Sequence, residues 1–246
     1  MCGTGRVTEE HAFPKWLREI FRGTEPGQIS DRCRGITTYD RERASEVFNA
    51  TVNSICRDCN GCWMSRLESA TKPVLGPMIY GQDATLPVSA QEILCRWAVK
   101  TAIVFQSRNP SSAAVTEQQR RRFCGPLHPL PAATDIHIAA FREPGDKVLC
   151  AHWYLAGSSR HDSTVDCFIA TFLLGRCVLQ VVKTNPQVPV TRDDSWAGRT
   201  VRLLPDDPTT ITWPTAAPLT SDDLNGFARS GFRSVSTLDP LPPFNL

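Results

Sequence analysis

Hydrophobic residues recur three and four positions apart in two long stretches of the chain, which is the spacing of an amphipathic helix. The first stretch covers residues 13–22, and Pro14 suits the first turn of a helix there. The second covers residues 90–106, where Ser89 with Glu92 three residues on has the form of a capping box. We therefore expect helices over both stretches.

Apolar and β-branched residues dominate the second half of the chain and predict four strands. These are residues 135–141, 148–155, 164–174 and 176–182. Gly145 and Gly175 stand where two of the intervening turns would fall. An antiparallel sheet with helices packed on it, the α+β class, is the expected architecture of this half.

The segments between these elements carry weaker patterns. Residues 23–34 are polar and contain Gly and Pro, which predicts a connection. Two β-rich stretches, 36–39 and 47–55, predict strands. A helix is expected to begin near Cys59, to carry Trp63, Met64 and Leu67 on one face and to end at Pro73 and Pro77. We also expect a short helix over 116–123 and a loop-like tail from Asn185, with one short helix near 221–229.

The composition is that of an ordinary globular protein. Of the 246 residues, 41% are hydrophobic and 21% charged, and the net charge of +2 neither requires nor excludes a nucleic-acid partner. The most apolar segment, 167–182, is too short to span a bilayer, and no secretory start is visible. We expect a cytoplasmic protein with no membrane partner. In a reducing compartment, paired cysteines more often hold metal than form disulfides, and the chain has ten cysteines.

Two short motifs near the start of the chain carry the candidate chemistry. In the first, Glu10 and His11 stand directly ahead of the first predicted helix. In the second, Cys56 and Cys59 have the Cys-x-x-Cys spacing of a zinc knuckle, and Asn60 follows at once.

Taken together and in this order, with Trp63, Met64 and Leu67 after the knuckle, the two motifs resemble the HNH endonuclease family in its zinc-stapled form. In that family a Glu/Asp-His pair ends one strand, a middle Asn lies on the next, and a Cys-x-x-Cys-His or Cys-x-x-Cys-Asn opens a helix. The block Trp97–Ala102 is also similar to one in uncharacterised bacterial, many of them actinobacterial, HNH proteins. The resemblance implies a small zinc-stabilised ββα unit over residues 1–75 and an α+β accessory domain over residues 85–246.

The resemblance also implies a reaction, the metal-dependent hydrolysis of phosphodiester bonds in DNA, with RNA as a further candidate substrate. His11 is the expected general base, because a neutral imidazole takes up a proton near pH 7. Glu10 and Asn60 are the expected oxygen ligands of a catalytic Mg²⁺ or Mn²⁺. Asn53 is the expected middle Asn that orients His11 through its carbonyl group, and Asn49 is the alternative.

The structural zinc site is incomplete in the sequence, because such a site needs four ligands. Cys56 and Cys59 supply two, and Cys2, followed by Gly3, resembles the end of a second knuckle. The fourth ligand is either a cysteine upstream of Met1, if the chain is a truncated reading of its gene, or Cys62. We favour the truncation, since Cys62 lies one helical turn beyond Cys59.

Two other functions compete with the nuclease. A catalytically weak or inactive zinc module would bind nucleic acid or a protein partner, and Lys15, Arg57 and Arg66 could then meet phosphates. A redox protein using Cys56 and Cys59 is weaker, because no thioredoxin-like βαβ pattern surrounds them. The other cysteines have no ligand spacing and are expected to be buried thiols: Cys33, Cys95, Cys124, Cys150, Cys167 and Cys177. The other histidines are expected to be structural or exposed: His128, His137, His152 and His161.

Overall fold

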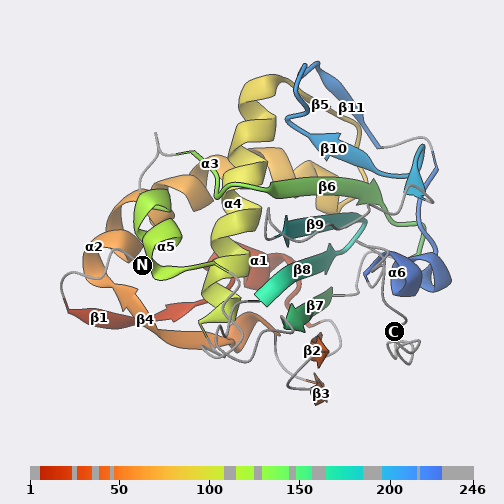
Figure 1. The fold of residues 1–246 in the computed structure, drawn as a ribbon. Coiled ribbons are helices and arrows are strands. Elements are labelled where there is room, and N and C mark those ends of the chain that lie inside the picture. Colours follow the sequence, from red (N-terminus) through yellow and green to blue (C-terminus); the bar gives the residue numbers. More distant parts are fainter. Residues whose placement is uncertain are drawn as a thin grey trace.

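A seven-stranded sheet forms the centre of the molecule (Figure 1). The computed structural model describes residues 6–23, 27–34, 39–44, 47–107, 115–124, 129–143, 148–156, 165–184, 196–214 and 217–228. The strand order is β10-β6-β9-β8-β7-β2-β3, and all neighbours are antiparallel except β2 and β7, which are parallel. The α+β class expected from the sequence is confirmed at this level.

The four strands predicted in the second half of the chain make up the middle of this sheet. They are β6 (Thr134–Ala140), β7 (Val148–Ala156), β8 (Val165–Leu174) and β9 (Cys177–Thr184). Gly175 lies in the β8–β9 turn with φ +59°, a backbone conformation that glycine adopts without a Cβ clash. Gly145 lies outside the described residues.

Two strands come from a part of the chain where the prediction was partly wrong. Residues 23–34 were expected to be a connection, but β2 (Gln28–Arg34) pairs with β7 on one side and with β3 (Tyr39–Ala44) on the other. The backbone hydrogen bonds of two neighbours hold β2 in place, and its polar sequence gives no alternating pattern. The strand expected over 36–39 mostly falls outside the described residues, and β3 begins at its last position.

Three helices lie at the stretches where the sequence predicted them. They are α1 (Lys15–Ile20), α4 (Val88–Gln106) and the shorter α5 (Glu117–Phe123). The capping box expected at Ser89 is wrong, because Pro87 occupies the N-cap of α4 and Ser89 lies inside the first turn. A capping box does form at the start of α5, where the Thr116 hydroxyl accepts from the Gln119 N–H.

The motif residues lie on a separate strand pair and the helical segment that follows it. Strand β1 (Val7–His11) pairs antiparallel with β4 (Thr51–Cys56), and a single 3₁₀ turn, η1 (Val47–Asn49), takes the start of the strand expected over 47–55. The chain then continues as α2 (Arg57–Cys59), one wide π-turn η2 (Asn60–Met64) and α3 (Ser65–Ile79).

Helix α3 does not end at its prolines as expected. It runs through Pro73 and Pro77 to Ile79. The buried side chains of α3 pack beside α4, so tertiary packing overrides the local cost of proline inside a helix. These side chains are Thr71, Leu75, Met78 and Ile79.

Alternate residues of the sheet face two hydrophobic clusters. On one face, Phe172 and Leu179 pack with Trp97 of α4 and with Phe13, which lies just before α1. The rings of Phe13 and Phe172 are 5.8 Å apart, so residues of the 1–75 region share a core with the sheet. The division into domains 1–75 and 85–246 remains a prediction.

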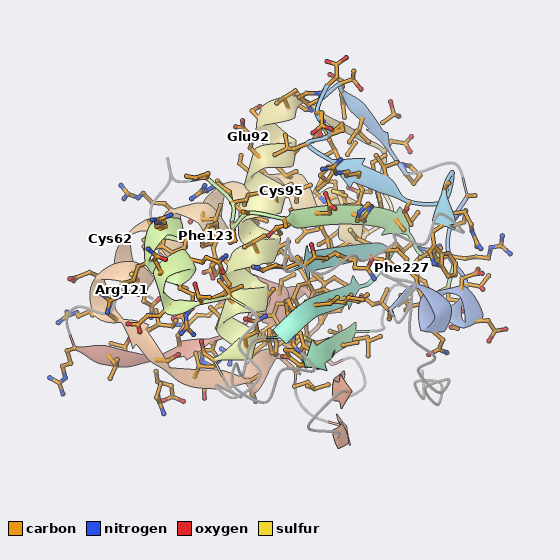
Figure 2. The ribbon with its side chains drawn as sticks, in the orientation of Figure 1. Cys62, Glu92, Cys95, Arg121, Phe123 and Phe227 are labelled. Atoms are coloured by element: carbon orange, nitrogen blue, oxygen red, sulfur yellow. The ribbon has the colours of Figure 1, made fainter. Side chains whose placement is uncertain are left out.

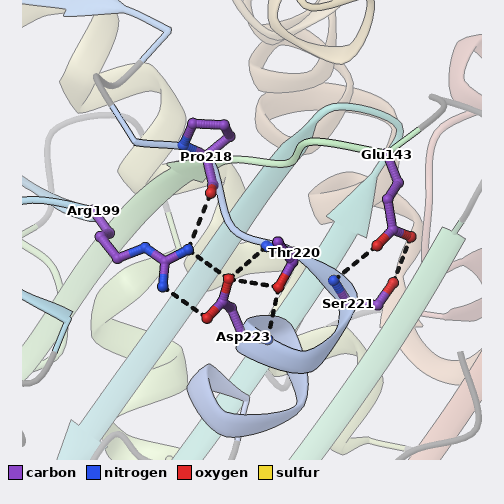
Figure 3. A network of polar contacts seen from close by, with 6 residues as sticks. All are labelled: Glu143, Arg199, Pro218, Thr220, Ser221 and Asp223. Atoms are coloured by element: carbon purple, nitrogen blue, oxygen red, sulfur yellow. Dashed lines mark hydrogen bonds and ion pairs between the residues drawn. The ribbon is translucent and has the colours of Figure 1, made fainter.

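The other face of the sheet is covered by α6 (Ser221–Phe227). Gln180 of β9 donates to the carbonyl of Phe227 at 2.8 Å. At the start of α6, Arg199 forms a bidentate ion pair with Asp223, while Glu143 accepts from the backbone and hydroxyl of Ser221 (Figure 3). Polar contacts therefore fix the beginning of this short helix.

The tail from Asn185 contains more structure than expected. Strand β10 (Val201–Leu203) joins the large sheet, and β11 (Ile211–Trp213) pairs with β5 (Ala84–Leu86) in a second, two-stranded sheet. Three-residue strands are too short to show a period in the sequence. None of the described helices has the length and apolar character needed to cross a membrane.

Candidate functional site

The candidate site lies where the end of β1 meets the helical segment after β4. Glu10 is the penultimate residue of β1 and stands opposite Val52 of β4. Its side chain is buried, with 8% exposed. Asn60, the first residue of η2, hydrogen-bonds to the Glu10 carboxylate. The structure therefore brings two of the predicted site residues together, although fifty positions separate them.

The electrostatic surroundings of Glu10 are unusual for a carboxyl group. The pKa of Glu10 is raised to about 7, chiefly by burial, and the nearby charge of Glu68 contributes in the same direction. The ammonium of Lys100 and the hydrogen bond from Asn60 act in the opposite direction. The carboxyl group of Glu10 thus changes charge close to neutral pH.

Lys100 and Glu68 were not among the residues singled out from the sequence. Lys100 on α4 is 0% exposed, and its Nζ lies 2.6 Å from Oε1 of Glu68 on α3, whose side chain is 18% exposed. A lysine inside the apolar run Trp97–Ala102 was the available signal, since a lysine that is fully buried needs a charged partner. The site is therefore an Asn60–Glu10 pair beside a Lys100–Glu68 ion pair.

His11 lies next to this group, on the strand position after Glu10. It stands opposite Thr51 and is half-buried. Among the described residues, its Nδ1 is buried and has no hydrogen-bond partner. The expected hydrogen bond from His11 to the carbonyl group of Asn53 is thus not formed at Nδ1 in the part of the chain that the structure describes.

A β-bulge explains the position of Asn53. Between the pairs Thr8–Ile55 and Glu10–Val52, two residues of β4, Asn53 and Ser54, stand opposite one residue of β1. Both are exposed. Bulges turn side chains out of the regular alternation, which sequence spacing does not reveal. The alternative, Asn49, accepts a hydrogen bond from Arg18 at 3.5 Å.

The knuckle cysteines sit at the turn between β4 and α2. Cys56 is the N-cap of α2, and its Sγ accepts from the Cys59 N–H at 3.4 Å. Both are buried, whereas Cys62 on the π-turn is exposed. Cys2 lies outside the described residues. A further cysteine reaches this turn, because Sγ of Cys124 lies 3.9 Å from Sγ of Cys59.

The described residues contain no group of three or more His, Cys, Asp or Glu side chains arranged to hold a metal ion. A Mg²⁺ site needs fewer, since Mg²⁺ keeps several waters and takes one or two carboxylates from the protein. Glu10 and Asn60 offer two adjacent oxygen donors, and the burial that raises the pKa of Glu10 favours neutralisation of its carboxylate by a cation. The donor chemistry of this pair fits a hard divalent ion.

The remaining histidines that the structure describes are structural, as expected. His152 of β7 is buried with its ring stacked on Phe168, and His137 of β6 is buried in the sheet. His128 and His161 lie outside the described residues. Cys95, Cys150, Cys167 and Cys177 are buried, as expected, and the side chain of Cys33 is not described.

Comparison with protein-family models, with curated proteins and with solved structures finds no match for this chain.

Proposed function

We propose that this protein is a metal-dependent HNH-type endonuclease that hydrolyses phosphodiester bonds in DNA, in the cytoplasm. The observation that carries the proposal is the buried contact between Glu10 and Asn60. The order of the elements around it supports the same function. The Glu10-His11 pair ends β1, Asn53 lies on the partner strand β4, and the Cys-x-x-Cys-Asn sequence opens the helical segment.

The proposal gives each of the three residues a role. His11 takes the proton from the attacking water as general base. The Glu10 carboxylate and the Asn60 amide oxygen would hold a Mg²⁺ or Mn²⁺ ion, and such an ion would supply positive charge to stabilise the charge that develops on the phosphate. Lys100 pairs with Glu68 beside them and gives this group of carboxylates a positive counter-charge.

A structural zinc at Cys56 and Cys59 completes the proposal. The N–H···S bond from Cys59 to Cys56 preorganises the turn that carries both cysteines. Zinc at this turn would fix the start of the helix that carries Asn60, and would so position one of the two oxygen donors.

One observation favours the alternative, a catalytically weak or inactive zinc module that binds nucleic acid or a protein partner. The Lys100 ammonium already places a fixed positive charge beside Glu10. A built-in cation lowers the affinity of this position for a second one. The module would then use its exposed arginines, among them Arg57 and Arg66, for phosphate contacts.

Plasmid cleavage distinguishes the two functions. We expect nicking by the pure wild-type protein with Mg²⁺ or Mn²⁺, none with EDTA, and a loss of about 10²–10⁴-fold for His11→Ala. Glu10→Gln should also lose activity, whereas the matched control Glu9→Gln, at an exposed neighbouring position, should not. Equal activity of wild type and His11→Ala would refute the catalytic assignment. Salt-dependent DNA binding without any metal-dependent product would favour the binding module.

A further inference from the structure

Cys124 brings a third thiol to the knuckle from a distant part of the chain. It follows α5 directly, sixty-five positions after Cys59, and the two sulfurs are 3.9 Å apart. No spacing rule in the sequence links these residues. The knuckle is thus faced by a cysteine of the region that was expected to form a separate accessory domain.

The end of α5 is held firmly against the start of the helical segment. The ring of Phe123 packs edge-on against Trp63 of η2, with centroids 5.8 Å apart and planes at 89°. The guanidinium group of Arg96 on α4 lies over the same ring at 5.1 Å. Figure 2 shows Phe123 and Cys62 on the side of the molecule where α5 stands beside η2. Packing of Phe123 therefore fixes the position of the next residue, Cys124.

We propose that Cys124 is a ligand of a structural zinc site together with Cys59 and Cys56, in the role first considered for Cys62. Zn–S bonds of about 2.3 Å in a tetrahedron place neighbouring sulfurs about 3.8 Å apart. The Cys59–Cys124 distance equals this edge within 0.2 Å. Cys56 lies on the same turn, and because the three sulfurs are not grouped around one metal position in the described residues, its side chain would turn toward the Cys59–Cys124 pair as zinc binds. Cys62 is exposed on the wide π-turn beyond it. The proposal rests on zinc at the knuckle and not on DNA cleavage.

Zinc binding at these residues has a simple proton balance. Each of the three thiols loses one proton to solvent as it becomes a thiolate ligand, and no oxidant or reductant is consumed. The Cys124 thiol, which donates to the Arg120 carbonyl at 3.2 Å, would give up this hydrogen bond. The fourth position is left to water or to a ligand outside the described residues. Zinc at this site would join α5 to the β4–α2 turn.

Metal analysis of the full chain tests the proposal without measuring cleavage. We expect one zinc per reduced chain, and a Co²⁺-substituted form with the charge-transfer and d–d bands of tetrahedral thiolate coordination. Cys124→Ser and Cys59→Ser should each weaken Zn²⁺ binding by roughly tenfold or more. Cys62→Ser, an exposed cysteine one turn away, and Cys95→Ser, a buried cysteine on α4, are matched controls that should bind as the wild type does.

Several results would overturn the proposal. They are full zinc affinity in Cys124→Ser, loss of zinc in Cys62→Ser alone, a Cys59–Cys124 disulfide in the freshly purified protein, or a reduced wild type that takes up no metal. If Cys124→Ser does not fold, the charge-transfer intensity of Co²⁺ in the wild type counts the thiolates. Three or four thiolates support the proposal, and two contradict it. Zinc retained by a chain that cuts no DNA would refute the nuclease function alone.

Discussion

At the scale of residues, the site is defined by charges that are buried together. Glu10 and Lys100 place a carboxyl group and an ammonium group in the protein interior, and the carboxyl group of Glu68 lies beside them at a partly exposed position. One carboxyl group can pair with the lysine, and the other is left with the amide of Asn60. Such an arrangement is costly for folding alone, since a buried ion pair contributes little net stability. The metal-binding role proposed for Glu10 would account for this cost.

Replacing Lys100 should show how strongly the lysine stabilises this group. Lys100→Met keeps the length of the side chain but leaves the buried Glu10 and the partly buried Glu68 without a cation, so we expect a loss of about 2–4 kcal/mol in the free energy of unfolding. Adding Glu68→Gln should recover part of the loss, because one of the two charges is then removed. Urea unfolding of the single and double variants measures both effects. A Lys100→Met protein as stable as the wild type would show that the pair is not coupled to folding.

The pH dependence of stability should report on Glu10. Its pKa is about 7 in the folded protein and near 4.5 in the unfolded chain, so the folded state keeps a proton that the unfolded state has lost. The free energy of unfolding should therefore fall as pH rises from about 4.5 to about 7, by up to about 3 kcal/mol from this group, and should not change further above that pH. The comparison is between wild type and Glu10→Gln, which lacks this slope. Parallel pH profiles of the two proteins would contradict the assignment.

At the scale of elements, α3 is where local preference and observed structure differ most. Pro73 is exposed inside the helix and supplies no N–H for the helical hydrogen bonds. Pro73→Ala should restore that donor and raise the free energy of unfolding by about 1–3 kcal/mol. Thermal unfolding of the variant checks this, with Pro129→Ala, an exposed proline outside the helices and strands, as the control. A loss of stability would mean that the proline ring packs favourably at this site.

Comparing the predicted with the observed elements shows which of them local sequence patterns can predict. The hydrophobic patterns of α4 and of the four central strands were sufficient to predict these elements, because the elements are long and bury one or both faces. Strand β2 was missed because its partners, and not its own pattern, determine its conformation. The expected end of the helix at Pro73 was wrong because packing against α4 is non-local.

The residues of the candidate site also fall into two groups, those that the sequence could predict and those that it could not. Glu10 and Asn60 could be chosen from their motifs, and the contact between them is present. Glu68, Lys100 and Cys124 could not, since each acts through a partner on another element at least thirty positions away. Asn53 lies on the strand that was predicted for it, but its side chain is exposed and does not bond to His11 Nδ1. A bulge changes which face of the strand a side chain is on without changing the sequence spacing.

At the scale of the whole molecule, the sheet is covered unequally on its two faces. The face toward α4 has a large core, whereas the other is covered by the short helix α6. The hydrogen bonds from Arg199 and Thr220 hold the pKa of Asp223 well below its usual range, so the ionised carboxylate stabilises the docked helix. This contribution is present above about pH 4 and is lost as pH falls toward the lowered value.

Asp223→Asn should therefore remove one source of acid sensitivity. We expect the variant to be less stable than the wild type at neutral pH, and the difference to shrink as pH falls below about 4, because the wild type then loses the same interaction. Asp222→Asn, at the exposed neighbouring position, is the matched control and should leave stability nearly unchanged. A constant difference between Asp223→Asn and wild type down to low pH would contradict this account.

The strand order of the large sheet has a consequence for solubility. In the part of the chain that the structure describes, β3 pairs with β2 alone and ends the sheet on that side. An edge strand has unpaired backbone N–H and C=O groups along its free side, and another extended chain can pair with them. Its sequence from Asp40 to Arg43 consists of four charged residues, alternating acidic and basic. Charged residues in an edge strand oppose the addition of a foreign strand, so the sequence of β3 is of the kind that disfavours edge-to-edge association of sheets.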